Sequence, residues 1–250
     1  MGENNFIVEP IGGLSNRLRV IMAAKTLCEE LGLNLKINWL YDSRFCHEMR
    51  KSEICGTHFL EVFEPLQTVK NTEISFVSTP ELPTVKNGEN FYRGTDVGFA
   101  RIRVSEFYKK LTAQYKFLKP RAYLREQIDL LTKRHSPYRS LHIRRGDHLR
   151  YLKKIKIEPD SLDKFESFIR AEPGGLFFLA TDCKKTQLLL TSKYKGRLFT
   201  SASLDSSATR PTSLQEAVVD IFLCVNSQKF LGTKLSSFSG LIQMLRTINE

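Results

Sequence analysis

The sequence predicts an α/β fold built from two parallel sheets with helices on their faces. Residues 6–39 contain a strand candidate at 6–8, an amphipathic helix that ends at Gly32, and an alternating strand at 33–39. From residue 140 to residue 248, short apolar strands alternate with helical segments. Repeated strand–helix units are typical of parallel sheets that are covered on both faces. These two observations together predict two α/β domains.

In the first half, one helix is expected to follow the glycine pair at 12–13. Its buried face should carry Leu18, Ile21, Cys28 and Leu31. Residues 41–98 are punctuated by proline and glycine, which predicts loops, short strands and a small helix. Another helix is expected at 104–118, and Pro120 fits the first turn of the helix after it.

In the second half, strands are expected at 140–143, 176–180, 198–199 and 229–232. Helices are expected at 161–171, 184–193, 213–225 and 238–248, and a loop should fill residues 144–160. Ser213 and Glu216 have the spacing of a capping box at the start of the third of these helices. The domain boundary should lie within 115–137, and we place it between domains 1–125 and 126–250.

The chain has 250 residues, 41% of them hydrophobic, which is enough for one large or two small cores. Its formal net charge of +11 suits a polyanionic partner: nucleic acid, an anionic membrane surface or a phosphorylated small molecule. A nucleic-acid-binding module is disfavoured because aromatic residues do not interleave with the basic ones. The basic run at 153–156 is equally well explained as a solvated surface.

The five cysteines are an odd number without a C-x-x-C pair, which favours a reducing compartment over a disulfide framework. We therefore expect a cytoplasmic protein. Zinc is not expected, because no Cys/His pairs have finger-like spacing. No apolar run reaches the roughly 18 residues that a membrane-spanning helix needs, and the N-terminus lacks the pattern of a signal peptide.

Four segments at the ends of expected strands have unusual polar content: 12–17, 142–147, 181–182 and 236–239. In open parallel sheets, ligands bind beyond the carboxyl ends of the strands. The pair Arg144 and Arg145 is the sharpest of these signals, because a guanidinium matches phosphate oxygens bidentately. The structural alternative is that Arg145 pairs with Asp147 as a loop clamp while Arg144 has no role.

The other signals are weaker, and the two serines taken alone are better explained as an ordinary helix cap. Ser236 and Ser237 precede a helix, where they could hold an anion or simply cap the helix. Gly12 and Gly13 would let the backbone approach a ligand closely, and Asp182 could be a helix cap. Asp220 lies in an apolar stretch and needs a partner, which could be a protein donor or the N–H groups of a ligand.

Taken together, four motifs resemble the superfamily of GDP-fucose-dependent fucosyltransferases, which includes the α-1,6-, nodulation-type and protein O-fucosyltransferases. They are Gly12–Leu18, the H-x-R-R-x-D segment His142–Asp147, Phe178–Asp182 and Ser236–Ser239. The likeness covers about residues 139–246 and the N-terminal motif, whereas residues 41–135 show none. The chain is also short for this superfamily, which leaves little room for acceptor-binding insertions.

The resemblance implies a GT-B type arrangement, in which two Rossmann-like domains face a cleft. It implies a donor held mainly by the C-terminal domain, an acceptor bound on the side of the N-terminal domain, and transfer that is inverting and needs no metal or other cofactor. Arg144 would bind the pyrophosphate, and Arg144 and Asn16 would be the catalytic residues. Asn16 and Arg17 would reach across from the N-terminal domain. The remaining donor contacts would come from Gly12, Gly13, Arg17, His142, Arg145, Asp147, Asp182, Asp220, Ser236, Ser237 and Phe238.

Metal independence also agrees with the lack of a D-x-D motif; the nearest segment, 158–160, precedes a helix and is interpreted as capping. The acceptor hydroxyl must lose a proton, and Asp147, Glu9 and His47 all remain candidate bases. The expected partners are a nucleotide sugar and a glycan or other hydroxyl acceptor. Alternatives are another nucleotide sugar as donor, or a nucleotide-binding protein without activity.

Overall fold

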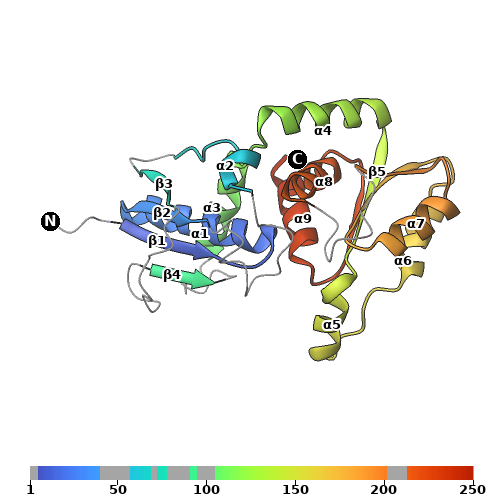
Figure 1. Cartoon of the computed structure of the whole chain (residues 1–250), viewed down its shortest axis with the longest axis horizontal. Helices are drawn as coiled ribbons and strands as arrows, with labels where there is room; N and C mark the ends of the chain where they lie inside the picture. The colour runs from blue at the N-terminus through green and yellow to red at the C-terminus, as the bar shows by residue number, and fades with distance from the viewer. Residues whose placement is uncertain are drawn as a thin grey trace. The chain divides into compact units, whose positions relative to one another are not determined.

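A computed structural model describes residues 5–39, 57–68, 72–77, 91–94, 105–201 and 213–249. Its internal contacts divide the chain into two compact units, Met1–Arg121 (unit 1) and Ala122–Glu250 (unit 2) (Figure 1). The boundary expected after residue 125 falls inside α4 (Ala122–His135), the first helix of unit 2. Among the described residues, no helix is both long and apolar enough to cross a membrane.

Unit 1 contains a four-stranded parallel sheet in the order β3-β2-β1-β4. Its strands are β1 (Asn5–Pro10), β2 (Asn34–Asn38), β3 (Ile74–Val77) and β4 (Phe91–Gly94). Its helices are α1 (Leu14–Leu31), the short α2 (Phe59–Val62) and α3 (Ser105–Gln114), which continues into a 3₁₀ turn at Tyr115–Phe117. The strand–helix–strand opening predicted from the sequence is confirmed.

Helix α1 ends as predicted at Gly32, whose φ of 67° lies in the left-handed region that glycine tolerates best. One residue of the predicted buried face is wrong, because Leu31 is 60% exposed. At about 100° per residue, Leu31 has rotated roughly 140° around the helix from Leu18 and has left the face that contacts the sheet.

A buried ion pair within α1 is hydrogen-bonded to Gln114 of α3. Lys25 Nζ lies 2.5 Å from Glu29 Oε1 and donates to Gln114 Oε1 at 2.6 Å, and the Gln114 amide donates to Glu29 Oε2 at 2.7 Å. Burial lowers the pKa of Lys25, and Glu29 opposes that shift. Each of these groups has a hydrogen-bond partner in the other two, which offsets the cost of burying them.

The prediction that Pro120 opens the next helix is wrong. Pro120 forms an isolated antiparallel bridge with Phe63, and α4 begins at Ala122. The amide of Arg121 donates to Val62 O at 2.9 Å, and the amide of Glu64 donates to Lys119 O at 2.8 Å. These bonds hold the segment extended, so the helix starts later.

Unit 2 contains a second four-stranded parallel sheet, in the order β7-β6-β5-β8. The strands are β5 (Tyr138–Ile143), β6 (Leu176–Thr181), β7 (Leu198–Phe199) and β8 (Phe230–Gly232). The helices after α4 are α5 (Gly146–Lys154), α6 (Leu162–Arg170), α7 (Lys184–Lys193), α8 (Leu214–Val225) and α9 (Ser237–Asn249). The predicted parallel sheets with flanking helices are thus confirmed.

Alternation along β5 decides which residues face which helices. Leu141 and Ile143 join a buried cluster with residues of α6 and α7. On the opposite face, the Tyr138 hydroxyl donates to Leu223 O of α8 at 2.7 Å, and His142 contacts Ser239 of α9. Helices therefore cover both faces of the sheet, and His142 lies on the side of α8 and α9.

Helix α5 was not expected, because residues 144–160 were interpreted as a loop. The helix has only two buried side chains, His148 and Leu152, so its apolar periodicity is too sparse to be recognised. The capping box of α8 is confirmed, since Ser213 Oγ accepts from the Glu216 amide and the Glu216 carboxylate accepts from the Ser213 amide.

Candidate functional site

Three polar segments meet at one edge of the sheet in unit 2. β5 pairs with β6 on one side and with β8 on the other, and all three strands are parallel. The residues that follow their carboxyl ends are 144–147, 182–183 and 233–239. The edge predicted to bind a ligand therefore brings together three of the four polar segments.

Arg144 is held between two carboxylates. Its Nη2 lies 2.8 Å from Asp147 Oδ1, and its Nη1 lies 3.3 Å from Asp182 Oδ2. Its backbone N–H donates to Thr233 Oγ1 at 2.9 Å, and Thr233 Oγ1 donates to His142 O at 2.9 Å. The guanidinium is thus oriented by Asp147 of α5 and by Asp182, which follows β6, whereas Thr233 holds the backbone of Arg144. The Arg144 side chain is 19% exposed.

The alternative in which Arg145 pairs with Asp147 is wrong. The Arg145 guanidinium donates to Asp160 O at 2.9 Å, and the Arg145 amide donates to Asp182 Oδ1 at 2.7 Å. Arg145 therefore fastens the segment before α6, while Arg144 pairs with Asp147. The interpretation of residues 158–160 as capping is also wrong for Asp160, because its carboxylate accepts from the Lys234 amide, and Ser161 caps α6.

Asp182 binds both arginines at this edge of the sheet and is not a helix cap. The residue at the N-cap of α7 is Cys183, which makes no side-chain capping bond, and the Asp182 carboxylate instead contacts both arginines. Gly146 makes room for it, because a Cβ built on Gly146 would lie 2.6 Å from Asp182 Oδ2. The glycine of the H-x-R-R-x-D segment therefore has a steric reason.

Ser236 caps α9, as its structural alternative predicted. Its Oγ accepts from the Ser239 amide at 3.4 Å, a weak bond with the geometry of an N-cap. Ser237 and Phe238 form the first turn of α9, whose N-terminal end carries partial positive charge. Phe238 also packs on His142, with the ring centroids 4.6 Å apart.

His142 is buried and neutral. Burial, with smaller contributions from Arg144 and His148, lowers its pKa to about 3. Its Nδ1 lies 2.7 Å from Ser239 Oγ, which also accepts from the Thr233 amide at 3.0 Å. Because Ser239 Oγ already accepts from Thr233, we assign its own proton to the bond with His142 Nδ1. The proton of the neutral ring then lies on Nε2.

Asp220 lies on α8 and has a protein donor. Its Oδ1 accepts from the Ser201 hydroxyl at 2.5 Å. Burial raises the pKa of Asp220 to about 7, against the opposing effect of the Ser201 hydrogen bond. Among the described residues, no hydrogen bond or ion pair links Asp220 to Arg144.

In unit 1, the N-terminal motif surrounds the start of α1. Gly12 has a φ of 89°, so this turn needs glycine, and Gly13 is the N-cap of α1. Asn16 is half-buried in the first helical turn. That Asn16 and Arg17 reach a ligand held by unit 2 stays a prediction.

Arg17 is fully buried within unit 1. Its Nε donates to Pro10 O at 3.0 Å, and its guanidinium lies 4.0 Å from the centre of the Trp39 ring. Burial lowers the pKa of Arg17 to about 9, and the nearby Glu9 partly opposes this shift. Glu9 itself accepts from the Asn38 amide at 2.8 Å, whereas His47, another candidate base, lies outside the described residues.

Sequence reasoning missed four residues that hold this arrangement: Thr233, Asp160, Ser201 and the side-chain role of Ser239. Thr233 has a usable signal, because it directly follows a short strand at the same edge of the sheet. Asp160 and Ser201 have none, since their partners lie 74 and 19 residues away along the chain.

No protein-family model matches this sequence, and no curated protein matches it. Among solved structures, a NodZ α-1,6-fucosyltransferase soaked with GDP-fucose matches with a TM-score of 0.63 and 16% identity, over 97% of this chain and 92% of that one. A NodZ fucosyltransferase from Bradyrhizobium gives the same TM-score and identity over 97% and 93%.

POFUT1 in complex with GDP-fucose also matches, with a TM-score of 0.63 and 12% identity over 98% of this chain and 95% of that one. At these identities the similarity concerns the fold. At that level the expected likeness is confirmed: the fold of this chain is similar to those of the fucosyltransferases NodZ and POFUT1.

Proposed function

We propose that this protein is a glycosyltransferase that moves L-fucose from GDP-fucose to a hydroxyl of a glycan or other acceptor, with inversion and without a metal ion. In this proposal the two units form a GT-B pair, unit 2 binds the donor and unit 1 lies on the acceptor side. Support comes from the fold shared with NodZ and POFUT1, both solved with GDP-fucose.

The observation that carries the proposal is the placement of Arg144. Arg144 follows the carboxyl end of a central strand, where ligands of open parallel sheets bind, and two carboxylates hold its partly exposed guanidinium there. A guanidinium has five N–H donors in a planar fork, so it can contact carboxylates and a phosphate together. Asp147 and Asp182 then act as positioning residues that set the plane of the fork.

The same edge offers a second source of phosphate stabilisation. The N-terminal turn of α9 contains Ser237 and Phe238, and a helix N-terminus favours an anion. As the bond between sugar and phosphate breaks, negative charge accumulates on the departing GDP. A preplaced guanidinium and helix N–H groups stabilise that charge more in the transition state than in the ground state.

For guanine recognition, we propose His142 and Asp220. Because its Nδ1 accepts from Ser239, a neutral His142 offers its Nε2–H as a donor. An ionised Asp220 can accept from the N1–H and N2–H groups of guanine, whereas uracil offers one N–H. Since burial raises the pKa of Asp220 to about 7, this recognition should strengthen as the pH rises through 7.

A thermal-shift panel tests the donor class. GDP and GDP-fucose should raise the melting temperature in metal-free buffer, because ligands that bind the native state stabilise it. UDP and a single-stranded oligonucleotide serve as matched anionic controls. Equal shifts with UDP-sugars would favour another donor, and a shift with the oligonucleotide alone would contradict the proposal. If the protein bound GDP-fucose but transferred fucose to none of a panel of glycans, the result would favour a nucleotide-binding protein without activity.

A further inference from the structure

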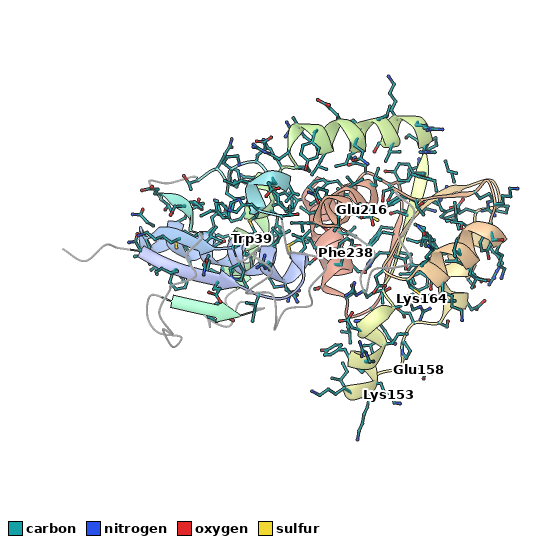
Figure 2. All side chains as sticks on the ribbon, viewed as in Figure 1. Trp39, Lys153, Glu158, Lys164, Glu216 and Phe238 are labelled. Carbon is teal, nitrogen blue, oxygen red and sulfur yellow. The ribbon has the colours of Figure 1, made fainter. Side chains whose placement is uncertain are left out.

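Helix α5 ends in a surface that is both basic and apolar. Residues 150–157 contain Arg150, Lys153, Lys154 and Lys156 and no acidic residue. Tyr151, Ile155 and Ile157 in the same stretch are 51%, 37% and 37% exposed. We call residues 150–157 the α5 tip. Figure 1 shows α5 projecting from the sheet of unit 2, and Figure 2 shows Lys153 pointing away from that unit.

The α5 tip is an ordered structure. Leu152 is fully buried and anchors the last turn. The Ile157 amide donates to Leu152 O at 3.0 Å and the Lys156 amide to Lys153 O at 3.2 Å, which is the hydrogen-bond pattern of a Schellman helix ending. The exposed isoleucines are therefore presented on a fixed turn.

The residue at the left-handed position of this ending is a lysine. Lys156 has a φ of 55°, in the region where glycine is strongly preferred. A lysine there gives up local backbone preference and adds a fourth cation beside two exposed isoleucines. The helix ending therefore carries a cation at a position that favours glycine, next to the exposed Ile155 and Ile157.

We propose that the α5 tip docks this protein on an anionic membrane surface, with its cations against the lipid phosphates and Tyr151, Ile155 and Ile157 in the interface. Anionic leaflets attract clusters of basic residues, and interfacial segments bury neighbouring apolar side chains at the boundary of headgroups and acyl chains. A nucleic acid fits less well, because it would use the lysines but has no place for two exposed isoleucines.

The proposal is independent of the proposed transferase activity, but it would place the candidate site near the membrane. Gly146 and Asp147 form the first turn of the same helix. With a rise of about 1.5 Å per residue, they lie roughly 12 Å along the axis from Lys154. The candidate site and the docking surface are thus at opposite ends of α5.

The test is flotation of the full chain with vesicles of phosphatidylcholine, with or without phosphatidylglycerol. We expect binding only when phosphatidylglycerol is present, with weakening as the salt concentration rises. The variant K153E/K154E/K156E should lose at least about 100-fold in affinity, because the loss of each lysine costs about 5-fold and the new glutamates add repulsion. The matched control K133E/K185E/K195E changes the same charge at three other exposed lysines of unit 2 and should bind much better. An equal loss in both variants would show that net charge drives binding and would overturn the proposal.

Two further variants separate the contributions. Lys156→Gly places the preferred residue at the left-handed position, so it should keep or raise the melting temperature while weakening vesicle binding about 5-fold. The variant I155S/I157S should keep the dependence on phosphatidylglycerol but lose the binding that persists at high salt. If I155S/I157S bound vesicles as well as the wild type, and the protein bound an oligonucleotide as tightly as vesicles, the α5 tip would be a site for polyanions in general. That result would overturn the proposal of membrane docking.

Discussion

Arg144 owes its position to neighbours that are remote from it in the sequence. Asp182 lies 38 residues away and Thr233 lies 89 residues away, yet both contact it at the carboxyl ends of adjacent strands. Asp147, one helical turn along, completes the set. Arg144, which the sequence marked most clearly as a ligand-binding residue, is therefore positioned by residues that the sequence marked only weakly.

Arg144→Ala should reduce transfer by about two to three decades, since removing a donor aimed at developing charge costs about 3–4 kcal/mol. The variant also leaves Asp147 and Asp182 without their shared cation, so the melting temperature should fall. Arg144→Lys should recover part of the stability, because it restores the charge, but little of kcat, because the fork is lost. Steady-state kinetics and thermal unfolding measure the two effects. Arg134→Ala, at an exposed arginine of α4, is the control. Near-normal turnover by a folded Arg144→Ala protein would contradict the assignment of this edge as the donor site.

Asp220 and His142 should give opposite dependences of stability on pH. The pKa of Asp220 is raised from 3.8 to about 7, so its folded form binds a proton that the unfolded chain releases. Its contribution to stability is complete below pH 3.8 and is lost as the pH rises to about 7. The pKa of His142 is lowered from 6.5 to about 3, so its contribution is present above 6.5 and is lost as the pH falls toward 3.

Asp220→Asn removes the first dependence and isolates the second. Its free energy of unfolding should exceed that of the wild type at about pH 8 by an amount on the order of 2–4 kcal/mol, and the difference should vanish near pH 4. Urea unfolding across this range measures it. In the same variant, guanine nucleotides should lose more affinity than uridine nucleotides. A variant that is less stable than the wild type at pH 8 would show that Asp220 is a needed structural anion.

At the scale of elements, the loop between β8 and α9 is fastened to α5 and to the segment before α6. The Lys234 amide donates to Asp160 Oδ2 at 2.8 Å, and Lys234 O lies 3.0 Å from His148 Nε2 of α5. Thr233 joins the same loop to β5 through His142 O. The loop that would contact the phosphates is therefore held by several elements of unit 2, which favours a preformed site.

Gly146→Ala tests how closely α5 must approach Asp182. The added Cβ would meet Asp182 Oδ2 at 2.6 Å, so the carboxylate must give up its contacts with Arg144 and the Arg145 amide or α5 must shift. We expect weaker GDP binding by about tenfold, equivalent to the loss of roughly 1–1.5 kcal/mol of hydrogen bonding. Isothermal titration calorimetry measures the change. Gly174→Ala, where a Cβ meets nothing within 4 Å, should bind GDP normally. If the two variants bound GDP equally well, the contact between Gly146 and Asp182 would have no part in the site.

At the scale of the whole molecule, each unit contains a four-stranded parallel sheet with the same strand order. In each sheet the first strand of the unit, β1 or β5, lies second from the edge, and the last strand, β4 or β8, lies at that edge. In both units, a segment singled out from the sequence follows that first strand: residues 12–17 after β1, and residues 144–147 after β5. This common placement follows from parallel strands, whose carboxyl ends and the turns that leave them share one edge.

Metal dependence is also a property of the whole chain, since ligands could come from any part of it. The sequence has no D-x-D motif, and in the proposed mechanism Arg144 stabilises the departing diphosphate in place of a metal ion. We expect transfer in excess EDTA at a rate within about twofold of that with added Mg²⁺ or Mn²⁺. The control is a metal-dependent glycosyltransferase assayed in the same buffer. Loss of transfer in EDTA and its return with metal would contradict metal independence.

The amino-acid sequence determined the class of fold and most of its elements, because these depend on local patterns. Alternation at 33–39, the capping box at Ser213 and the glycine at position 32 each act within a few residues, and each prediction held. Helix α5 was not predicted because its two buried side chains form too weak a period. Leu31 was misplaced because, at about 100° per residue, it lies roughly 140° around the helix from Leu18. Pro120 was misplaced because a bridge to Phe63 overrides its local preference.

For the candidate site, the sequence by itself singled out the charged segments, since adjacent arginines at a strand end have few structural uses. Only the tertiary structure decided how they pair: Arg144 with Asp147 and Asp182, Arg145 with Asp160 O, and Asp220 with Ser201. Pairing depends on which strands are neighbours and on where each side chain points, and β5 acquires its neighbours from segments 38 and 90 residues further along the chain. The sequence shows which residues are charged. The partner of each charged residue depends on which distant segments fold onto the same edge of the sheet.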